Sequence, residues 1–283
     1  MICLKWFVRL FLPLLVLTIC LSARAQTFPA PEPTPAVSKA PSLEREFFKN
    51  ILRDQKAIWT APLHVDRGDA KWMVPAGIGF MALATTDRIT GDEMGEAERQ
   101  VGLSKAISEA GSVYGLGAVA ATFYFVGRKN HNYRARETGL LSAEALIDSV
   151  IVESALKGIT QRARPSAGRE RSEFFDGGSS FPSGHSTQAW AVATVIANEY
   201  KDRRAVQIAA YGIASAVSVA RFTGHKHYLS DVIAGSALGY GIGRYVYESH
   251  HRDPALSQSR WPRITPEFNR QARQYGCALT WNF

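Results

Sequence analysis

The apolar residues of this chain recur at helical spacing, and this pattern limits the folds open to it. Alternation with the two-residue period of a strand is weak throughout the body of the chain, so the sequence predicts an all-α fold, a helical bundle. We expect a polar turn at 66–71, and loop with a short helix at 85–108. The expected helices cover 43–59, 72–84, 111–127, 140–157, 186–200, 205–221 and 229–247.

The apolar segments leave the relation to a membrane open. None of them reaches about 18 uninterrupted apolar residues, the usual threshold for a membrane-spanning helix. Gln207 and Arg244 interrupt two of the longest. A water-soluble bundle and a bundle of short membrane spans both fit. We slightly favour the soluble bundle, because Gly and Ala also permit close helix packing in water.

The N-terminal residues 1–25 have the pattern of a secretory signal peptide. Lys5 and Arg9 form a basic start, 10–21 is an apolar stretch, and 23–25 is an A-x-A cleavage pattern. We therefore expect export to the periplasm or to the periplasmic face of the cell envelope. An uncleaved N-terminal anchor is the alternative.

The rest of the chain divides by composition into three parts. Residues 26–42 are a Pro-rich linker, and 43–250 form the expected helical domain, with the motif-bearing core at about 140–245. Residues 251–283 are a C-terminal tail. Large residues alternate with smaller or polar ones at its end, which indicates a terminal strand or a packed tail. The alternating residues are Tyr275, Cys277, Leu279, Trp281 and Phe283.

The net charge of the 283-residue chain is +8, which suits anionic partners of several kinds. The three cysteines form no C-x-x-C pattern and no Cys/His metal spacing. We expect no metal, no cofactor and no nucleic acid. Oligomeric state is not indicated.

Two cations near the end of one expected helix are candidates for holding a doubly charged anion. Lys157 lies at the end of the helix, and Arg164 follows seven residues later. Because Pro165 disfavours helical conformation at the residue before it, we expect Arg164 on the following loop. Arg offers a planar fork and Lys a point charge. A solvated basic helix end is the alternative.

The segment Ser180-Phe-Pro-Ser-Gly-His-Ser186 precedes another expected helix and predicts an anion site. Such a turn leaves backbone N–H groups free, and Gly184 lets a ligand approach the backbone closely. Ser183 offers a hydroxyl, either to the ligand or as a helix cap. His185 lies at the rim of the site, and a capping or core histidine is the alternative for it.

His227 and Asp231 are four residues apart, so on a helix their side chains would be neighbours. A carboxylate beside an imidazole fixes the tautomer and leaves the other nitrogen free to attack. An ordinary surface pair is the alternative. We interpret the nearby His225 as a structural residue.

Taken together, the three blocks resemble the type 2 phosphatidic-acid phosphatase and vanadium haloperoxidase superfamily. Its signature is K-x6-RP, then PSGH, then SR-x5-H-x3-D. The matching residues here are Lys157, Arg164, Pro165, Pro182, Ser183, Gly184, His185, Arg221, His227 and Asp231. One position departs: Ala220 stands where the family usually has Ser.

The resemblance implies a helical bundle and a role for each matched side chain. His227 is implied as the nucleophile that forms a phosphohistidine, oriented by Asp231. His185 is implied as the acid that protonates the leaving group and then activates water. The implied phosphate-binding residues are Lys157, Arg164, Ser183, Gly184 and Arg221. No metal is implied, because these cations supply the charge stabilisation.

The function expected from the resemblance is a metal-independent phosphatase acting outside the cytoplasm. Its substrates would be phosphomonoesters or pyrophosphates, either on lipids, with possible membrane association, or on small soluble molecules. A vanadate-dependent haloperoxidase is one alternative, because the same residues serve both chemistries. A non-catalytic phosphate-binding protein of the envelope is the other.

Overall fold

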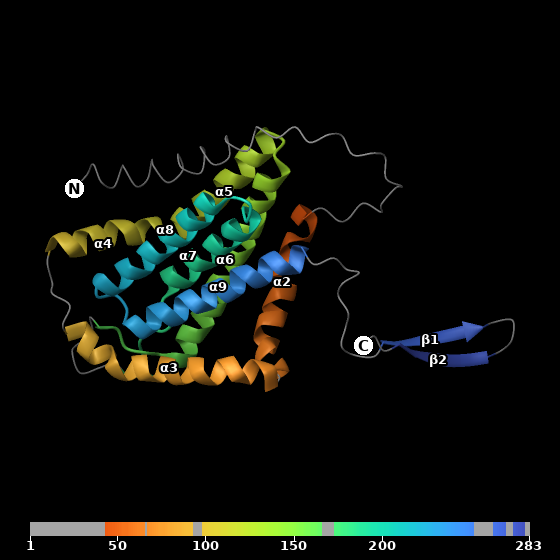
Figure 1. Cartoon of the computed structure of the whole chain (residues 1–283), viewed down its shortest axis with the longest axis horizontal. Helices are drawn as coiled ribbons and strands as arrows, with labels where there is room; N and C mark the ends of the chain where they lie inside the picture. Colours follow the sequence, from red (N-terminus) through yellow and green to blue (C-terminus); the bar gives the residue numbers. More distant parts are fainter. Residues whose placement is uncertain are drawn as a thin grey trace. The chain divides into compact units, whose positions relative to one another are not determined.

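Figure 1 shows the computed structural model of the chain, which describes residues 43–65, 67–92, 98–165, 173–251, 263–269 and 274–280. Contacts divide the chain into two compact units, Met1–Tyr247 and Glu248–Phe283. The prediction of an all-α body is confirmed by the helices α2 (Leu43–Thr60), η2 (Ala61–His64), α3 (Arg67–Asp92), α4 (Glu98–Ala110), α5 (Val113–Lys129), α6 (Tyr133–Thr160), α7 (Gly184–Glu199), α8 (Arg204–Thr223) and α9 (Leu229–His251).

The helix α3 differs from the prediction at both ends. It runs through most of the expected polar turn at 66–71 and continues into the expected loop, to Asp92. Tertiary contact explains the C-terminal extension, since Asp87 is buried and binds groups from two other segments. Packing of this kind overrides the weak helix propensity of a polar sequence. As a result, α3 lies across one end of the bundle (Figure 1).

The core of the helical unit lies around α6 and α7, which occupy the middle of the bundle (Figure 1). One apolar cluster joins α6, α7 and α9, and a second joins α5, α6, α7 and α8. The first cluster contains Leu141, Ala145, Val152, Ala191, Val195, Ile242 and Val246. Burial of each large side chain contributes about 1.5–3 kcal/mol, which makes α6 and α7 a rigid support for the residues at their ends.

A row of glycines on α9 allows this helix to approach α7 closely. The row consists of Gly235, Gly239 and Gly243, and the facing residues are Ser183, Thr187 and Ala191. A Cβ atom built on Gly239 would lie 2.1 Å from the carbonyl oxygen of Thr187, so no larger residue fits without movement. This contact fixes the start of α9 against the start of α7, where two of the three sequence blocks lie.

We expect Gly239→Ala to destabilise the protein by about 1–3 kcal/mol, because the added methyl group forces α7 and α9 apart. Gly241→Ala is the matched control. A Cβ at Gly241 meets nothing within 4 Å, and Ala is favoured over Gly inside a helix by roughly 0.5–1 kcal/mol. Denaturant unfolding followed by circular dichroism compares the two variants. Equal effects of the two substitutions would contradict the packing argument.

The second unit contains a β-hairpin. Strand β1 (Arg263–Asn269) pairs antiparallel with β2 (Gln274–Thr280), with Arg263 opposite Thr280. Strand β2 overlaps the alternating C-terminal residues, whereas β1 had no counterpart in the predictions. The predicted signal peptide (1–25) and linker (26–42) lie outside the described residues.

Candidate active site

The first two sequence blocks meet where the end of α6 contacts the start of α7. Lys157 lies in the last turn of α6 and forms an ion pair with Glu153, one turn earlier. A Cβ atom on Gly184 would lie 2.8 Å from Lys157 Nζ and from both Glu153 carboxylate oxygens. The absence of a side chain at Gly184 therefore lets the Lys157 ammonium group approach the α7 backbone.

The helix α6 ends at Thr160, and Gln161 caps it in the left-handed conformation (φ 43°). Arg164 therefore lies on the loop after the helix, where Pro165 led us to expect it. The next described residues, from Glu173 onward, return to this loop, and the Ala163 N–H donates to the Glu173 carbonyl.

The start of α7 has the open backbone that its sequence predicts. Ser183 is the N-cap residue, but its hydroxyl makes no capping hydrogen bond and instead accepts one from Ser186 Oγ at 3.1 Å. The first N–H groups of a helix have no acceptor within the helix. This end of α7 therefore offers backbone donors to an anion.

His185, on the first turn of α7, shows that the predicted cations converge. Burial, and then the charges of Arg221, of His227 when it is protonated, of Lys157 and of Arg164, lower the pKa of His185 to about 3. Side chains from all three sequence blocks therefore act on one imidazole. Cations that converge on one place in the fold are the electrostatic property expected of a phosphate site.

Arg221 lies in the last turn of α8 and has an unmatched donor. Its Nε atom is buried and has no hydrogen-bond partner among the described residues. Burial, and then the charge of Arg164, lower the Arg221 pKa to about 10. A buried donor without an acceptor costs free energy, on the order of 1–3 kcal/mol, so this guanidinium group is prepared for an anionic ligand.

His227 is held in one orientation by its surroundings. The helix α9 begins at Leu229, as the sequence predicted, so His227 precedes it; the side chains of His227 and Asp231 are close together, but they do not lie on one helix. The His227 Nδ1 atom lies 2.7 Å from the Ser180 carbonyl oxygen and 3.9 Å from Asp231 Oδ2. Since a carbonyl can only accept, Nδ1 carries the hydrogen and Nε2 keeps its lone pair.

Asp231 acts on His227 directly, across 3.9 Å, and is also connected to it through Ser180. Its Oδ2 atom accepts the Ser180 hydroxyl at 2.6 Å and the Tyr228 N–H at 3.1 Å. The second bond is half of a capping box, in which the third residue of a helix reaches back to the N-cap; this explains why α9 starts after His227. Burial alone raises the pKa of the Asp231 carboxyl, but His227, Arg162 and Ser180 together hold it below its ordinary value.

Arg162 is the central functional residue that the sequence analysis missed. Its guanidinium group is 1% exposed and bridges two buried carboxylates. Nη1 donates to Asp231 Oδ1 at 2.5 Å and to Ser230 Oγ at 2.7 Å, while Nη2 donates to Asp87 Oδ2 at 2.8 Å. The Ser230 N–H also donates to Asp87. This network connects α3 and the loop after α6 to the start of α9.

Two aromatic rings enclose the same guanidinium group. The Arg162 Cζ atom lies 4.7 Å from the centre of the Phe174 ring and 4.6 Å from that of Tyr228. The sequence feature that could have identified Arg162 was its position, because it lies two residues before Arg164 inside the first block. Asp87 gave no signal, because it lies in a segment that the sequence predicted as polar loop.

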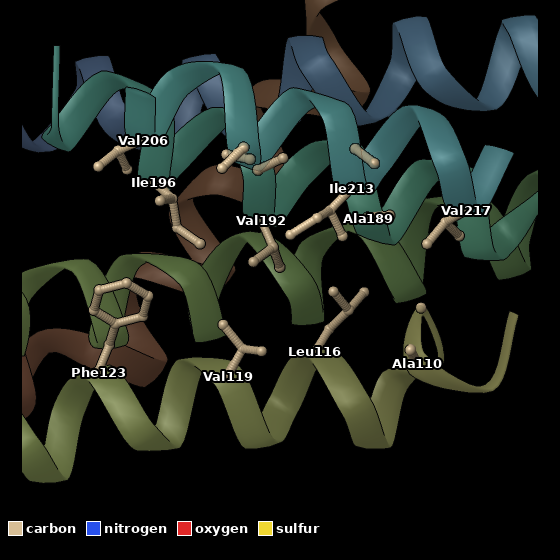
Figure 2. A pocket seen from close by; sticks show the side chains of 15 residues that line it. Ala110, Leu116, Val119, Phe123, Ala189, Val192, Ile196, Val206, Ile213 and Val217 are labelled. Carbon is tan, nitrogen blue, oxygen red and sulfur yellow. The ribbon is translucent and has the colours of Figure 1, made fainter. Parts of the chain in front are cut away.

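An apolar cavity of about 70 Å³ lies between α5, α7 and α8 (Figure 2). Its lining includes Leu116, Val119, Val192, Ala214 and Val217. The cavity ends close to the cations: on α8, Val217 is one turn before Arg221, and on α7, Ala189 is one turn after His185. A charged site and an apolar space therefore adjoin one another.

Residues 138–254 match the family model of the PAP2 superfamily. This segment belongs to the PAP2 superfamily. The match covers all three sequence blocks and confirms the resemblance that they predicted. Within this PAP2 segment lie all the residues of the site described above except Asp87, which α3 contributes from outside it.

Two relatives share parts of the PAP2 segment. Lipid A 1-phosphatase of Porphyromonas gingivalis is 31% identical over 103 residues, which cover 36% of this chain and 23% of that protein. A PA-phosphatase related-family protein of Dictyostelium discoideum is 26% identical over 168 residues, 52% of this chain and 61% of that protein. The chain thus spans less than two thirds of the length of either relative.

Two solved PAP2 structures are similar. The transmembrane PAP2-type phosphatidylglycerolphosphate phosphatase of Bacillus subtilis has a TM-score of 0.45 and 20% identity, covering 74% of this chain and 98% of that one. LpxE of Aquifex aeolicus has a TM-score of 0.42 and 19% identity, covering 58% of this chain and 93% of that one.

Proposed function

We propose that this protein is a phosphatase that hydrolyses lipid phosphates through a phosphohistidine at His227. The observation that carries the proposal is the state of that side chain. His227 is 2% exposed, its Nδ1 atom is committed to the Ser180 carbonyl, and its unprotonated Nε2 atom is left as the nucleophile. The half-buried Arg221 acts on the same imidazole, and its buried Nε atom is an unmatched donor among the described residues.

In the first half of the reaction, Nε2 of His227 attacks phosphorus and the bond to the leaving oxygen breaks. Lys157, Arg164, Arg221, the Ser183 hydroxyl and the backbone at Gly184 bind the phosphoryl oxygens. Positive charge placed before the reaction stabilises the charge that spreads over these oxygens in the transition state. The negative charge of Asp231, 3.9 Å from Nδ1, stabilises the imidazolium that forms.

His185 supplies and then removes the proton. In the free protein burial, and then the surrounding cations, keep it neutral, with a pKa of about 3. A bound phosphate group cancels much of that positive field and raises the pKa, so that His185 becomes an acid when substrate is present. It protonates the leaving oxygen, then deprotonates a water that attacks the phosphohistidine and releases phosphate.

Three observations support a lipid as the carrier of the phosphate. The apolar cavity of Figure 2 adjoins the cations and suits a hydrocarbon chain. The helix α3, which contacts the site through Phe80 and Asp87, exposes a group of apolar side chains: Met73, Val74, Ile78 and Met81. The name of the Porphyromonas gingivalis relative also specifies a lipid phosphate. Groups of exposed apolar residues commonly mark membrane contact.

Export and membrane association belong to the same proposal. The leader-like residues 1–25 support action outside the cytoplasm. Among the described helices, α8 alone is long and apolar enough by length and composition to cross a membrane. Carbonate washing of a cell fraction that contains the full chain separates a membrane-embedded protein from a soluble one.

The function is tested by phosphate release from matched substrates. We expect the purified full chain, in detergent micelles, to hydrolyse a long-chain lipid phosphate with a higher kcat/KM than a small chromogenic phosphomonoester. The apolar cavity contributes binding only to the former. Turnover of the small ester alone would contradict the lipid assignment. Absence of turnover on both, with retained phosphate binding, would contradict the phosphatase itself.

A further inference from the structure

A buried carboxylate lies among the groups that bind phosphate in the proposed function. Glu153 is 6% exposed and lies on α6, one helical turn before Lys157, with which it forms an ion pair. The Lys157 side chain is 21% exposed, so the cation of the pair is more accessible than the anion. An acidic side chain is rarely buried this deeply without such a partner, and no step of the proposed reaction uses Glu153.

The Glu153 carboxylate also contacts the first turn of α7, where the backbone donors for an anion lie. A Cβ atom on Gly184 would lie 2.8 Å from Glu153 Oε1 and from Glu153 Oε2, so both oxygens lie against the first residue of α7. The buried Gln188, one turn further along α7, donates from Nε2 to Glu153 Oε1 at 3.2 Å. The carboxylate is therefore held at this place from both α6 and α7.

Glu153 differs from the other buried carboxylates of the site in the cation that it neutralises. Asp87 and Asp231 pair with Arg162, which is not one of the proposed phosphate-binding residues. Glu153 instead pairs with Lys157, which does bind phosphate in the proposed function. The negative charge of Glu153 therefore reduces the positive charge that this side of the site offers to a phosphate group.

We propose that Glu153 limits the affinity of the site for phosphate. The inference rests on the proposed function, since it needs a phosphate group bound at Lys157 and at the start of α7. An ammonium group has three N–H donors and can bind two anions at once, so the bound phosphate group lies close to a second negative charge. Water and salt screen charges weakly in a largely buried site, and this repulsion therefore opposes phosphate binding.

A limit on phosphate affinity benefits a phosphatase, because the product is the same group that the substrate carries. Interactions that bind substrate and transition state equally well lower KM without raising kcat. The same interactions also hold the phosphate product, and product release limits kcat in many enzymes. Glu153 therefore favours release of phosphate, while Lys157 stays in place for the transition state.

Binding of inorganic phosphate to the full chain tests the inference without any need for turnover. Glu153→Gln keeps the shape of the side chain and an oxygen for Gln188, but removes the charge. We expect this variant to bind inorganic phosphate about tenfold more tightly than the wild type in isothermal titration calorimetry. Glu153→Asp, which keeps the charge, should bind no more tightly than the wild type.

Glu46→Gln is the matched control for the change in charge. It removes one negative charge from an ion pair of α2, in which the Lys49 side chain is 78% exposed. Exposed pairs contribute little, and neither residue belongs to the site. We therefore expect this variant to bind phosphate as the wild type does.

Steady-state kinetics supply the second readout. With a small phosphomonoester, the KM and the inhibition constant of phosphate should both fall in Glu153→Gln by a similar factor, while kcat does not rise. A misplaced Lys157 would instead raise KM, so the direction of the change separates an effect of charge from an effect of structure. Phosphate binding by Glu153→Gln that is equal to or weaker than that of the wild type overturns the inference. Tighter binding with no turnover by any of the proteins would support the inference and contradict the proposed phosphatase.

Discussion

Replacing His227 by alanine should reduce kcat by about 10⁴-fold or more, since removal of a nucleophile that forms a covalent intermediate leaves only binding and charge stabilisation. The imidazole is fixed by a hydrogen bond from Nδ1 to the Ser180 carbonyl, so no other group of the site can take its place. Release of inorganic phosphate from a small ester measures the loss.

The matched control for His227 is His225, two residues earlier in the same loop. His225 has a positive φ of 52°, which Asn tolerates better than Ala, so His225→Asn is the suitable change. We expect this variant to keep activity within about tenfold of the wild type. An alkaline quench with radiolabelled substrate should trap a phosphorylated protein in the control but not in His227→Ala. Near-normal turnover by a folded, pure His227→Ala sample would falsify the mechanism.

The helices and the three-block signature could be predicted because both are local in the sequence. Apolar residues at helical spacing located α5, α7, α8 and α9 within about four residues at each end, whereas α6 begins seven residues before the predicted start at 140. The signature identified side chains that the fold brings together, as the effects of Arg221, Lys157 and Arg164 on His185 show. The catalytic and binding roles of these residues remain predictions.

The support of the site could not be predicted, because it depends on contacts between distant segments. Arg162 looked like a spacer residue inside the first block, and Asp87 is 75 residues away from it in the chain. Ser180 belongs to the second block, yet its part in connecting Asp231 to His227 requires three segments to meet. A sequence pattern does not show which distant segments come into contact in the folded chain.

The cap of α9 was also not predicted. The sequence placed the start of this helix at residue 229, between His227 and Asp231, but it did not show which group caps that start. The structure shows that Asp231 caps α9 through the Tyr228 N–H. The same carboxylate therefore ends the loop that holds His227 and positions Ser180, so one residue has both a structural and a functional effect.

Replacing Arg162 by leucine should destabilise the protein by about 3–5 kcal/mol, because it leaves two carboxylates buried without their cation. Asp87 and Asp231 are 1% and 0% exposed, and Arg162 Nη atoms reach both. Since total stabilities are only about 5–15 kcal/mol, this loss is large. Chemical unfolding at neutral pH measures it. Arg203→Leu is the control, since its Nε atom is 3.9 Å from a half-exposed Asp202 carboxylate and its loss should cost less than about 1 kcal/mol.

The pH dependence of the unfolding free energy of Arg162→Leu shows whether the variant is destabilised by the lost positive charge or by the lost packing. Without Arg162, burial raises the pKa of Asp231 in the folded variant above its value in the unfolded chain. A group with a raised folded pKa binds a proton more tightly in the folded state, so the variant should regain stability as the pH falls. The wild type should instead lose stability as the pH falls, because the pKa of Asp231 is lowered in its folded state. A destabilisation of Arg162→Leu that is the same at neutral and mildly acidic pH would show that the guanidinium group acts by packing between Phe174 and Tyr228 and not by its charge.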